Sequence, residues 1–283
     1  MSYNEKLTVS AEKYQSLLCF GMDPVIEKFP SSIKGNTKEK IVKFYSSIID
    51  ASLSSNPSSF SALKPNYAFY AQYGWEGLQA LKELIDKYKS KYPIILDVKR
   101  GDIGSTAKAY AKEGYEFWGA DALTLSPFMG KDSVEPYFNY FEGGKGAYLL
   151  CRTSNAGAQD FICQKMGAKP LYLHILSKAI GWHKDGLGLV VGATDAKDLA
   201  AILKEIDKSG KRFSLLIPGV GSQGGSAGEV MALLGKYPAL LPLARINASS
   251  SISYAFEKQK TTDFVGSSLA EIASLNKFLV YKG

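Results

Sequence analysis

Two acids and two bases lie within six positions of one segment, "PIILDVKRGDIGST" (93–106). They are Asp97, Lys99, Arg100 and Asp102. The apolar run before them predicts a buried strand. Charged groups are costly to bury without partners, so we expect this strand to end at a site where opposite charges meet.

The spacing of the charged residues predicts which of them act together. Successive side chains on a strand point to opposite faces, so Asp97 and Lys99 share one face and Val98 lies on the other. Lys64, which ends the preceding apolar run, is expected next to them. Such a row keeps both lysines charged and leaves one amine donor free to act. The alternative is an internal salt bridge, although a buried ion pair is rarely a net stabiliser.

Asp102 is expected away from this row. Arg100 and Gly101 form a turn, and Ser105 or Thr106 is expected to cap the next helix. Asp102 therefore lies on a loop that leaves the strand. It either folds back over its own strand or reaches a neighbouring subunit. The sequence assigns no role to Arg100.

The elements that position these residues are short apolar runs, most of them followed by a helical pattern. Eight strands are predicted, at 17–22, 60–66, 93–99, 121–127, 147–154, 187–194, 213–220 and 243–250. Helices are predicted at 38–53, 77–88, 105–118, 134–141, 170–182, 196–208, 229–234 and 269–280. The apolar runs are continuous, which is typical of parallel strands buried on both faces.

Alternation of strands and helices indicates an α/β fold. Eight repeats in 283 residues favour a (β/α)₈ TIM barrel in one domain spanning 1–283, with an open doubly wound sheet as the alternative. Residues 128–146 and 155–170 are expected to form longer loops over the barrel mouth. In such barrels the chemistry lies at the C-terminal ends of the strands. Polar residues follow nearly every predicted strand, including Asp23, Lys64, Asp97, Lys99 and Ser154.

The segment "LLIPGVGSQGG" (215–225) ends the seventh predicted strand in glycines. Glycine lets backbone N–H groups approach an anion closely, and barrels often hold phosphate after the seventh and eighth strands. The spacing of Gly219, Gly221 and Gly224 is a weak signal by itself. A dinucleotide-binding reading fails because no acidic partner follows on a later strand.

Composition limits the function classes. The net charge of +7 and the pI of about 9.0 mildly favour an anionic partner, but no nucleic-acid motif supports nucleic-acid binding. No signal peptide and no membrane span are expected. Cys19 and Cys151 lie in apolar runs and form no CxxC pair, which fits a reducing cytoplasm. His174 and His183 are interpreted as structural or surface residues, so no metal site is predicted.

The charged segment resembles the DxKxxDI(G/P)xT signature of the orotidine 5′-phosphate decarboxylase family. Four further stretches are similar to that family's other landmarks, in the same order: "FGMDP" (20–24), "FSALKPNYAFY" (60–70), "CRTSNAGAQDF" (151–161) and "PGVGSQGG" (218–225). The resemblance spans about residues 14–256. The segments "KPNYAFY" and "TSN" resemble those of the bacterial type 2 branch.

The resemblance implies a TIM-barrel homodimer that needs no metal or organic cofactor. It would convert orotidine 5′-monophosphate to UMP and carbon dioxide, the last step of de novo pyrimidine synthesis. Lys64, Asp97 and Lys99 would form a charged tetrad with Asp102 of the other subunit, and Lys99 would donate the proton to C6. The resemblance implies substrate-binding roles for Asp23, Lys64, Thr106 from across the dimer, Ser154, Gln223 and the backbone at Gly219 and Gly221.

One position departs from the family pattern. An arginine that pairs with the substrate phosphate is expected after the eighth strand, where this chain has Ser250. Arg245 lies five residues earlier and is not expected to substitute. The departure keeps open a non-catalytic nucleotide-binding barrel. A magnesium-dependent sugar-phosphate decarboxylase or lyase of the same superfamily is the other alternative. Those relatives carry an acid near the second-strand lysine, whereas Lys64 follows Leu63.

Overall fold

The computed structural model describes residues 1–55, 59–220 and 225–282. Eight parallel strands form one sheet in the order β2-β1-β10-β9-β8-β5-β4-β3. Isolated parallel bridges Leu63↔Ile94 and Asn66↔Asp97 join β2 to β3 and close the ring. The strands are β1 (Leu18–Met22), β2 (Ala62–Pro65), β3 (Ile95–Arg100), β4 (Ala122–Leu125), β5 (Gly146–Arg152), β8 (Leu187–Val191), β9 (Ser214–Ile217) and β10 (Ala244–Ala248). The predicted (β/α)₈ barrel and its eight strands are confirmed.

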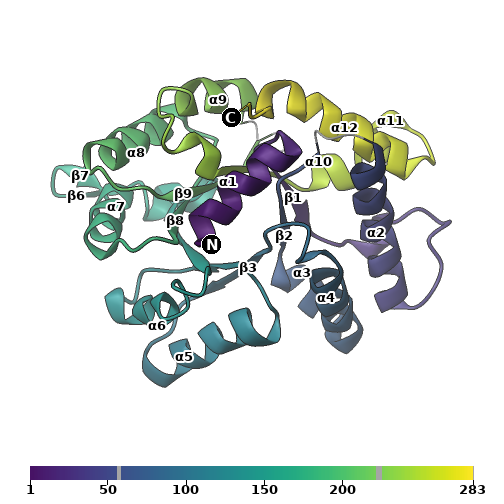
Figure 1. The fold of residues 1–283 in the computed structure, drawn as a ribbon, viewed down its shortest axis with the longest axis horizontal. Coiled ribbons are helices and arrows are strands. Elements are labelled where there is room, and N and C mark those ends of the chain that lie inside the picture. Colours follow the sequence, from purple (N-terminus) through teal and green to yellow (C-terminus); the bar gives the residue numbers. More distant parts are fainter. Residues whose placement is uncertain (56–58, 221–224, 283) are drawn as a thin grey trace.

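Helices surround the ring of strands (Figure 1). They are α2 (Thr37–Ser55), α3 (Tyr67–Ala71), α4 (Gly74–Tyr88), α5 (Gly104–Lys112), α6 (Glu135–Phe138), α7 (Leu171–Trp182), α8 (Ala196–Lys208), α9 (Ala227–Leu234), α10 (Ser250–Ser253), α11 (Ala255–Gln259) and α12 (Phe264–Leu279). Shorter turns are η1 (Ile26–Lys28), η2 (Glu113–Phe117), η3 (Lys131–Ser133), η4 (Ala156–Asp160) and η5 (Leu241–Leu243). The sequence pattern did not predict α3, α10 or α11, which are four or five residues long.

Alternation along the strands separates two apolar layers. Ile95 packs in the barrel interior, whereas its neighbours Ile94 and Leu96 pack beneath the helices. The same alternation recurs in β4, where Ala122 faces inward and Leu123 outward. Both faces of each strand are therefore buried, which is the physical reason for the continuous apolar runs in the sequence.

An N-terminal helix, α1 (Tyr3–Tyr14), covers one end of the barrel and was not predicted. Its sequence is polar, but Ser2 and Glu5 form a reciprocal capping box that starts the helix. Tyr3 and Leu7 join the interior apolar cluster, and the Tyr3 hydroxyl lies 2.9 Å from that of Tyr148. The helix thus closes the end of the barrel opposite the strand C-termini.

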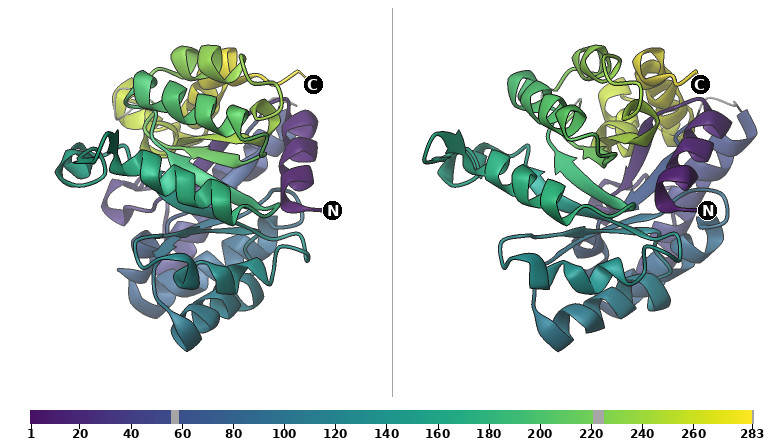
Figure 2. Two further views of the ribbon diagram at one scale, coloured as in Figure 1. Left: turned by 90° about the vertical axis from the view of Figure 1, so that its left-hand side faces the viewer. Right: turned by 60° about the vertical axis from the view of Figure 1, so that its left-hand side comes forward.

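The other end of the barrel carries a projecting segment (Figure 2). The sequence predicted a long loop at 155–170, and the structure adds a short hairpin to it, β6 (Lys165–Met166) with β7 (Lys169–Pro170). Across the described ranges, none of the helices is both long and apolar enough to cross a membrane. Cys19 and Cys151 are buried, as predicted, and neither is in a disulfide.

Candidate active site

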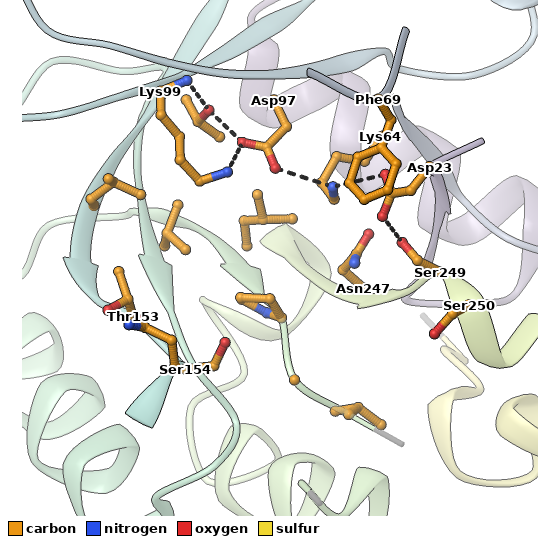
Figure 3. A pocket seen from close by; sticks show the side chains of 18 of the residues that line it. Asp23, Lys64, Phe69, Asp97, Lys99, Thr153, Ser154, Asn247, Ser249 and Ser250 are labelled. Atoms are coloured by element: carbon orange, nitrogen blue, oxygen red, sulfur yellow. Dashed lines mark hydrogen bonds and ion pairs between the residues drawn. The ribbon is translucent and has the colours of Figure 1, made fainter. Parts of the chain in front are cut away.

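A cavity of about 640 Å³ opens at the C-terminal ends of the strands. This is in the size range of small-molecule sites. Its walls bring together side chains from β2, β3, β4, β5, β8, β9 and β10 and from the segment that follows β1 (Figure 3). Leu150, Val190 and Leu216 form an apolar part of the lining. The site therefore combines a row of charges with an apolar wall.

Asp97 lies at the centre of the charged row. Lys99 Nζ donates to Asp97 Oδ1 at 2.7 Å, so the two side chains share a face as the strand period indicates. Thr124 donates its hydroxyl to the same carboxylate oxygen at 2.8 Å. Thr124 Oγ1 also accepts the backbone N–H groups of Val98 and Lys99. One threonine therefore holds both the carboxylate and the backbone that carries the ammonium.

The backbone at Lys99 is unusual. Its φ is +46°, a left-handed conformation that costs a non-glycine residue roughly 1–2 kcal/mol. The pairing of β3 with β4 is irregular between Leu96 and Arg100. Such strained positions cluster at functional sites, where the surrounding structure stabilises them. Here the irregularity falls at the residue whose ammonium pairs with Asp97.

Lys64 binds the other side of Asp97. Its Nζ lies 3.2 Å from Asp97 Oδ2 and 4.0 Å from Asp23 Oδ1, and both Lys64 and Asp97 are buried. Burial by itself would raise the pKa of the Asp97 carboxyl, but the ammoniums of Lys64 and Lys99 hold it far below its ordinary value. Burial would lower the pKa of Lys64, yet Asp23 and Asp97 raise it above its ordinary value. Asp97 and Lys64 are consequently both charged at neutral pH.

Asp23 carries an oxygen that is ready to accept a hydrogen bond. Its Oδ2 accepts from the Ser249 hydroxyl at 2.6 Å. Its Oδ1 is buried and has no hydrogen-bond donor within the described part of the chain, and the same holds for Asn247 Oδ1 nearby. Buried polar atoms normally have hydrogen-bond partners. Two unsatisfied acceptors at the cavity wall therefore suit a ligand that brings hydroxyl groups.

Glycine allows the opposite wall to pack closely. A Cβ at Gly192 would lie 2.8 Å from the Cα of Ser154, too close for any larger residue. Ser154 and its neighbour Thr153 line the cavity from the end of β5 (Figure 3). Gly219, with φ +98°, lines it after β9. These residues face the charged row across the cavity.

Asp102 and Thr106 do not line this cavity. Asp102 lies on the loop after β3, where its carboxylate accepts the N–H of Ile103. Thr106 is exposed on α5. The predicted cap by Ser105 or Thr106 was wrong. The helix begins earlier, at Gly104, and Ile103 occupies the cap position without a side-chain hydrogen bond.

Arg100 has a structural role that the sequence did not reveal. It donates to both carboxylate oxygens of Glu113, at 3.0 and 2.9 Å. Its guanidinium also lies over the rings of Tyr67 and Tyr110, 5.1 and 4.3 Å from their centroids. Arg100 thereby ties the end of β3 to the neighbouring helices.

Ser250 lies at the rim of the cavity beyond Ser249 (Figure 3). Arg245 cannot take its place. It is fully buried and donates to the carbonyls of Pro242, Ala244 and Leu7, the last of these in α1 at the closed end of the barrel. Gly221 and Gln223, two of the predicted ligand contacts, lie outside the described residues.

Sequence reasoning missed Thr124 and Ser249, which hold Asp97 and Asp23. Thr124 left a signal, because a polar residue at an inward position of an apolar strand requires a partner inside the barrel. Ser249 left none, because its partner is 226 positions away in the chain. Within the described ranges, no group of three or more histidine, cysteine or acidic side chains is arranged to hold a metal ion.

Comparison with known proteins identifies the family. A family model described as "Orotidine 5'-phosphate decarboxylase / HUMPS family" matches residues 18–238. A curated relative from Verminephrobacter eiseniae, named orotidine 5'-phosphate decarboxylase, is 39% identical and covers 99% of this chain and 98% of its own. One of the same name from Delftia acidovorans is 42% identical over 90% of each chain.

The fold agrees with these matches. The solved structure of Leishmania donovani OMP decarboxylase superimposes with a TM-score of 0.76 at 30% identity, covering 98% of both chains. The superposition spans nearly the whole barrel. The chain therefore belongs to the orotidine 5'-phosphate decarboxylase family.

Proposed function

We propose that this protein decarboxylates orotidine 5′-monophosphate to UMP, the last step of de novo pyrimidine synthesis, without a metal or organic cofactor. The observation that carries the proposal is the Lys64–Asp97–Lys99 row at the mouth of a nucleotide-sized cavity. The whole chain, 1–283, would act as one barrel domain.

In the proposed reaction the bond between C6 and the carboxylate breaks. The electron pair stays on C6, carbon dioxide leaves, and Lys99 Nζ supplies the proton that forms the new C6–H bond. Solvent then returns a proton to Lys99. A fixed ammonium beside an apolar wall stabilises the developing charge far better than water does, because the site needs no reorganisation. Asp97 would lie next to the departing carboxylate while keeping Lys99 protonated.

The remaining contacts would orient the nucleotide. Asp23 and Lys64 would hold the ribose hydroxyls, which the unsatisfied Asp23 Oδ1 supports. Ser154 would bind the pyrimidine edge from the opposite wall. The backbone at Gly219 and Gly221 would cradle the phosphate, with Gln223 bridging base and phosphate.

We further propose a homodimer in which Asp102 and Thr106 complete the neighbouring site. Three observations support this arrangement. Asp102 does not line the cavity of its own subunit, Thr106 is exposed on α5, and Ile103 between them in the sequence is 46% exposed. The free thiols of Cys19, Cys151 and Cys163 support a reducing compartment, the cytoplasm.

The test of the activity is direct. Purified protein mixed with orotidine 5′-monophosphate should abolish the orotate absorbance and release UMP, and prior treatment with EDTA should not change the rate. No decay of the absorbance at micromolar protein would refute the function. Loss of activity in EDTA that magnesium restores would favour the magnesium-dependent alternative instead.

Mixing two inactive variants tests the shared site. Lys99→Ala and Asp102→Asn should each be inactive alone. After refolding together in equal amounts, about half of the dimers are mixed, and each mixed dimer holds one intact site. Activity should therefore return to about a quarter of wild type. If Asp102 acted within its own subunit, the mixture would recover no activity. The matched control is a mixture of Lys99→Ala with Asp97→Asn, which should recover none because both substitutions lie in the same subunit's site.

A further inference from the structure

The end of the cavity that the proposed function gives to the phosphate has few cationic side chains among its described residues. Gly219 and Ser250 line it where β9 and β10 end. Among the described residues that line the cavity, the cationic side chains are Lys28, Lys64 and Lys99. Lys64 and Lys99 are both paired with Asp97. Lys28 is therefore the cation that the described lining leaves for a phosphate dianion.

Lys28 is held near Ser250 by the structure around it. It belongs to η1, which follows β1, and β1 pairs directly with β10 in the sheet. The Tyr254 hydroxyl accepts the N–H of Val25 at 2.8 Å and donates to the carbonyl of Asp23 at 3.1 Å. The Lys28 ammonium lies 5.2 Å from the centroid of the Tyr254 ring. The segment that carries Lys28 is thus fastened to the segment that begins at Ser250.

The present partner of Lys28 is one that it can exchange. Its Nζ lies 3.1 Å from Glu257 Oε2, and the two side chains are 47% and 42% exposed. Exposed ion pairs contribute little free energy because water screens them. A phosphate dianion offers more charge and more acceptor oxygens than one carboxylate.

We propose that Lys28 is the phosphate-binding cation of this site, that it exchanges Glu257 for the nucleotide phosphate, and that it supplies the positive charge that Ser250 lacks. The inference rests on the proposed function, because it takes a nucleoside monophosphate as the ligand. Glu257 then acts as a competitor that holds the ammonium at the rim until the phosphate arrives.

Binding of UMP and of uridine, measured by calorimetry without turnover, tests the assignment. Lys28→Met should weaken UMP binding by about 10-fold or more, the effect of losing a charge-assisted hydrogen bond, and leave uridine binding unchanged. Glu257→Gln should tighten UMP binding by about 2- to 5-fold, because an exposed competing pair is removed. Ser250→Arg added to Lys28→Met should restore UMP affinity, since both positions line the same cavity.

The matched control is Lys258→Met, which removes the same charge from an exposed lysine next to Glu257 and outside the cavity lining. It should leave both affinities unchanged. The assignment would be overturned if Lys28→Met bound UMP as tightly as wild type, or if it lost as much affinity for uridine as for UMP. It would also be overturned by an equal loss of UMP affinity in Lys258→Met, by no tightening in Glu257→Gln, or by no recovery when Ser250→Arg is added. A protein that binds UMP through Lys28 but decarboxylates nothing would refute the proposed function and leave the role of Lys28 intact.

Discussion

Lys99→Ala is expected to lower the rate of decarboxylation by about 10⁴-fold, the upper end of what a general acid contributes. The variant loses both the proton donor and the ammonium that stabilises charge on C6. It should still fold, because the Lys99 side chain is half exposed. The measurements are single-turnover decay of the orotate absorbance and the thermal unfolding midpoint.

Lys99→Gly provides a second variant that separates chemistry from folding. Glycine adopts the φ of +46° without strain, so this variant should be more stable than Lys99→Ala by about 1 kcal/mol. It should be equally inactive. Turnover close to wild type in either variant would contradict the assignment of Lys99 as the proton donor. Inactivity accompanied by unfolding in both would show that Lys99 acts through the structure instead.

Asp97→Asn is expected to cost about 3–5 kcal/mol of unfolding free energy, as when one partner of a buried ion pair is removed. The substitution keeps the shape but leaves two ammoniums facing a neutral amide, with Lys64 buried and its remaining acid, Asp23, 4.0 Å away. Activity should be lost as well. Urea unfolding monitored by circular dichroism measures the stability.

The stability difference should depend on pH with a definite sign. The pKa of Asp97 is depressed in the folded protein, so its contribution is fully present above the unfolded value of about 3.9. It is lost as pH falls further toward the folded value. Wild type and Asp97→Asn should therefore differ by a constant amount between about pH 5 and 8 and converge below about pH 4.

The control for this comparison is Asp86→Asn. Asp86 pairs with Lys82 and Lys89 on the exposed face of α4, and its pKa is also lowered, by hydrogen bonds to those lysines. Because that pair is exposed, its loss should cost less than about 1 kcal/mol. Similar losses of unfolding free energy in the two variants would mean that the ion pairs of Asp97 stabilise the fold no more than an exposed ion pair does.

The sequence by itself determined the barrel. Each of its strands is buried on both faces and is therefore a continuous apolar run in the sequence. The eight runs can be recognised without any structure. It also determined the partnership of Asp97 with Lys99, because a separation of two positions puts both side chains on the same face of a strand. Lys64 could be placed beside them because the preceding run ends at it.

Elements and contacts that depend on distant residues could not be predicted in this way. Helix α1 reads as polar because only one side of it meets the barrel, and its buried partners lie far along the chain. The predicted cap of α5 was wrong because the helix starts at Gly104, where Ile103 occupies the cap position without a side-chain hydrogen bond. The contacts of Arg100 with Glu113 and two tyrosine rings could not be predicted, because they form only where separate elements pack together.

What the tertiary structure alone decided is how the site is held. Thr124 fixes Asp97 and the strained backbone of Lys99 from the next strand, and Ser249 fixes Asp23 from the other end of the sequence. Lys28 reaches the cavity because β1 pairs with β10. The local sequence determines on which face of a strand a side chain lies. Contacts between strands depend on the closure of the barrel instead. Closure brings together residues whose separation in the chain follows no period.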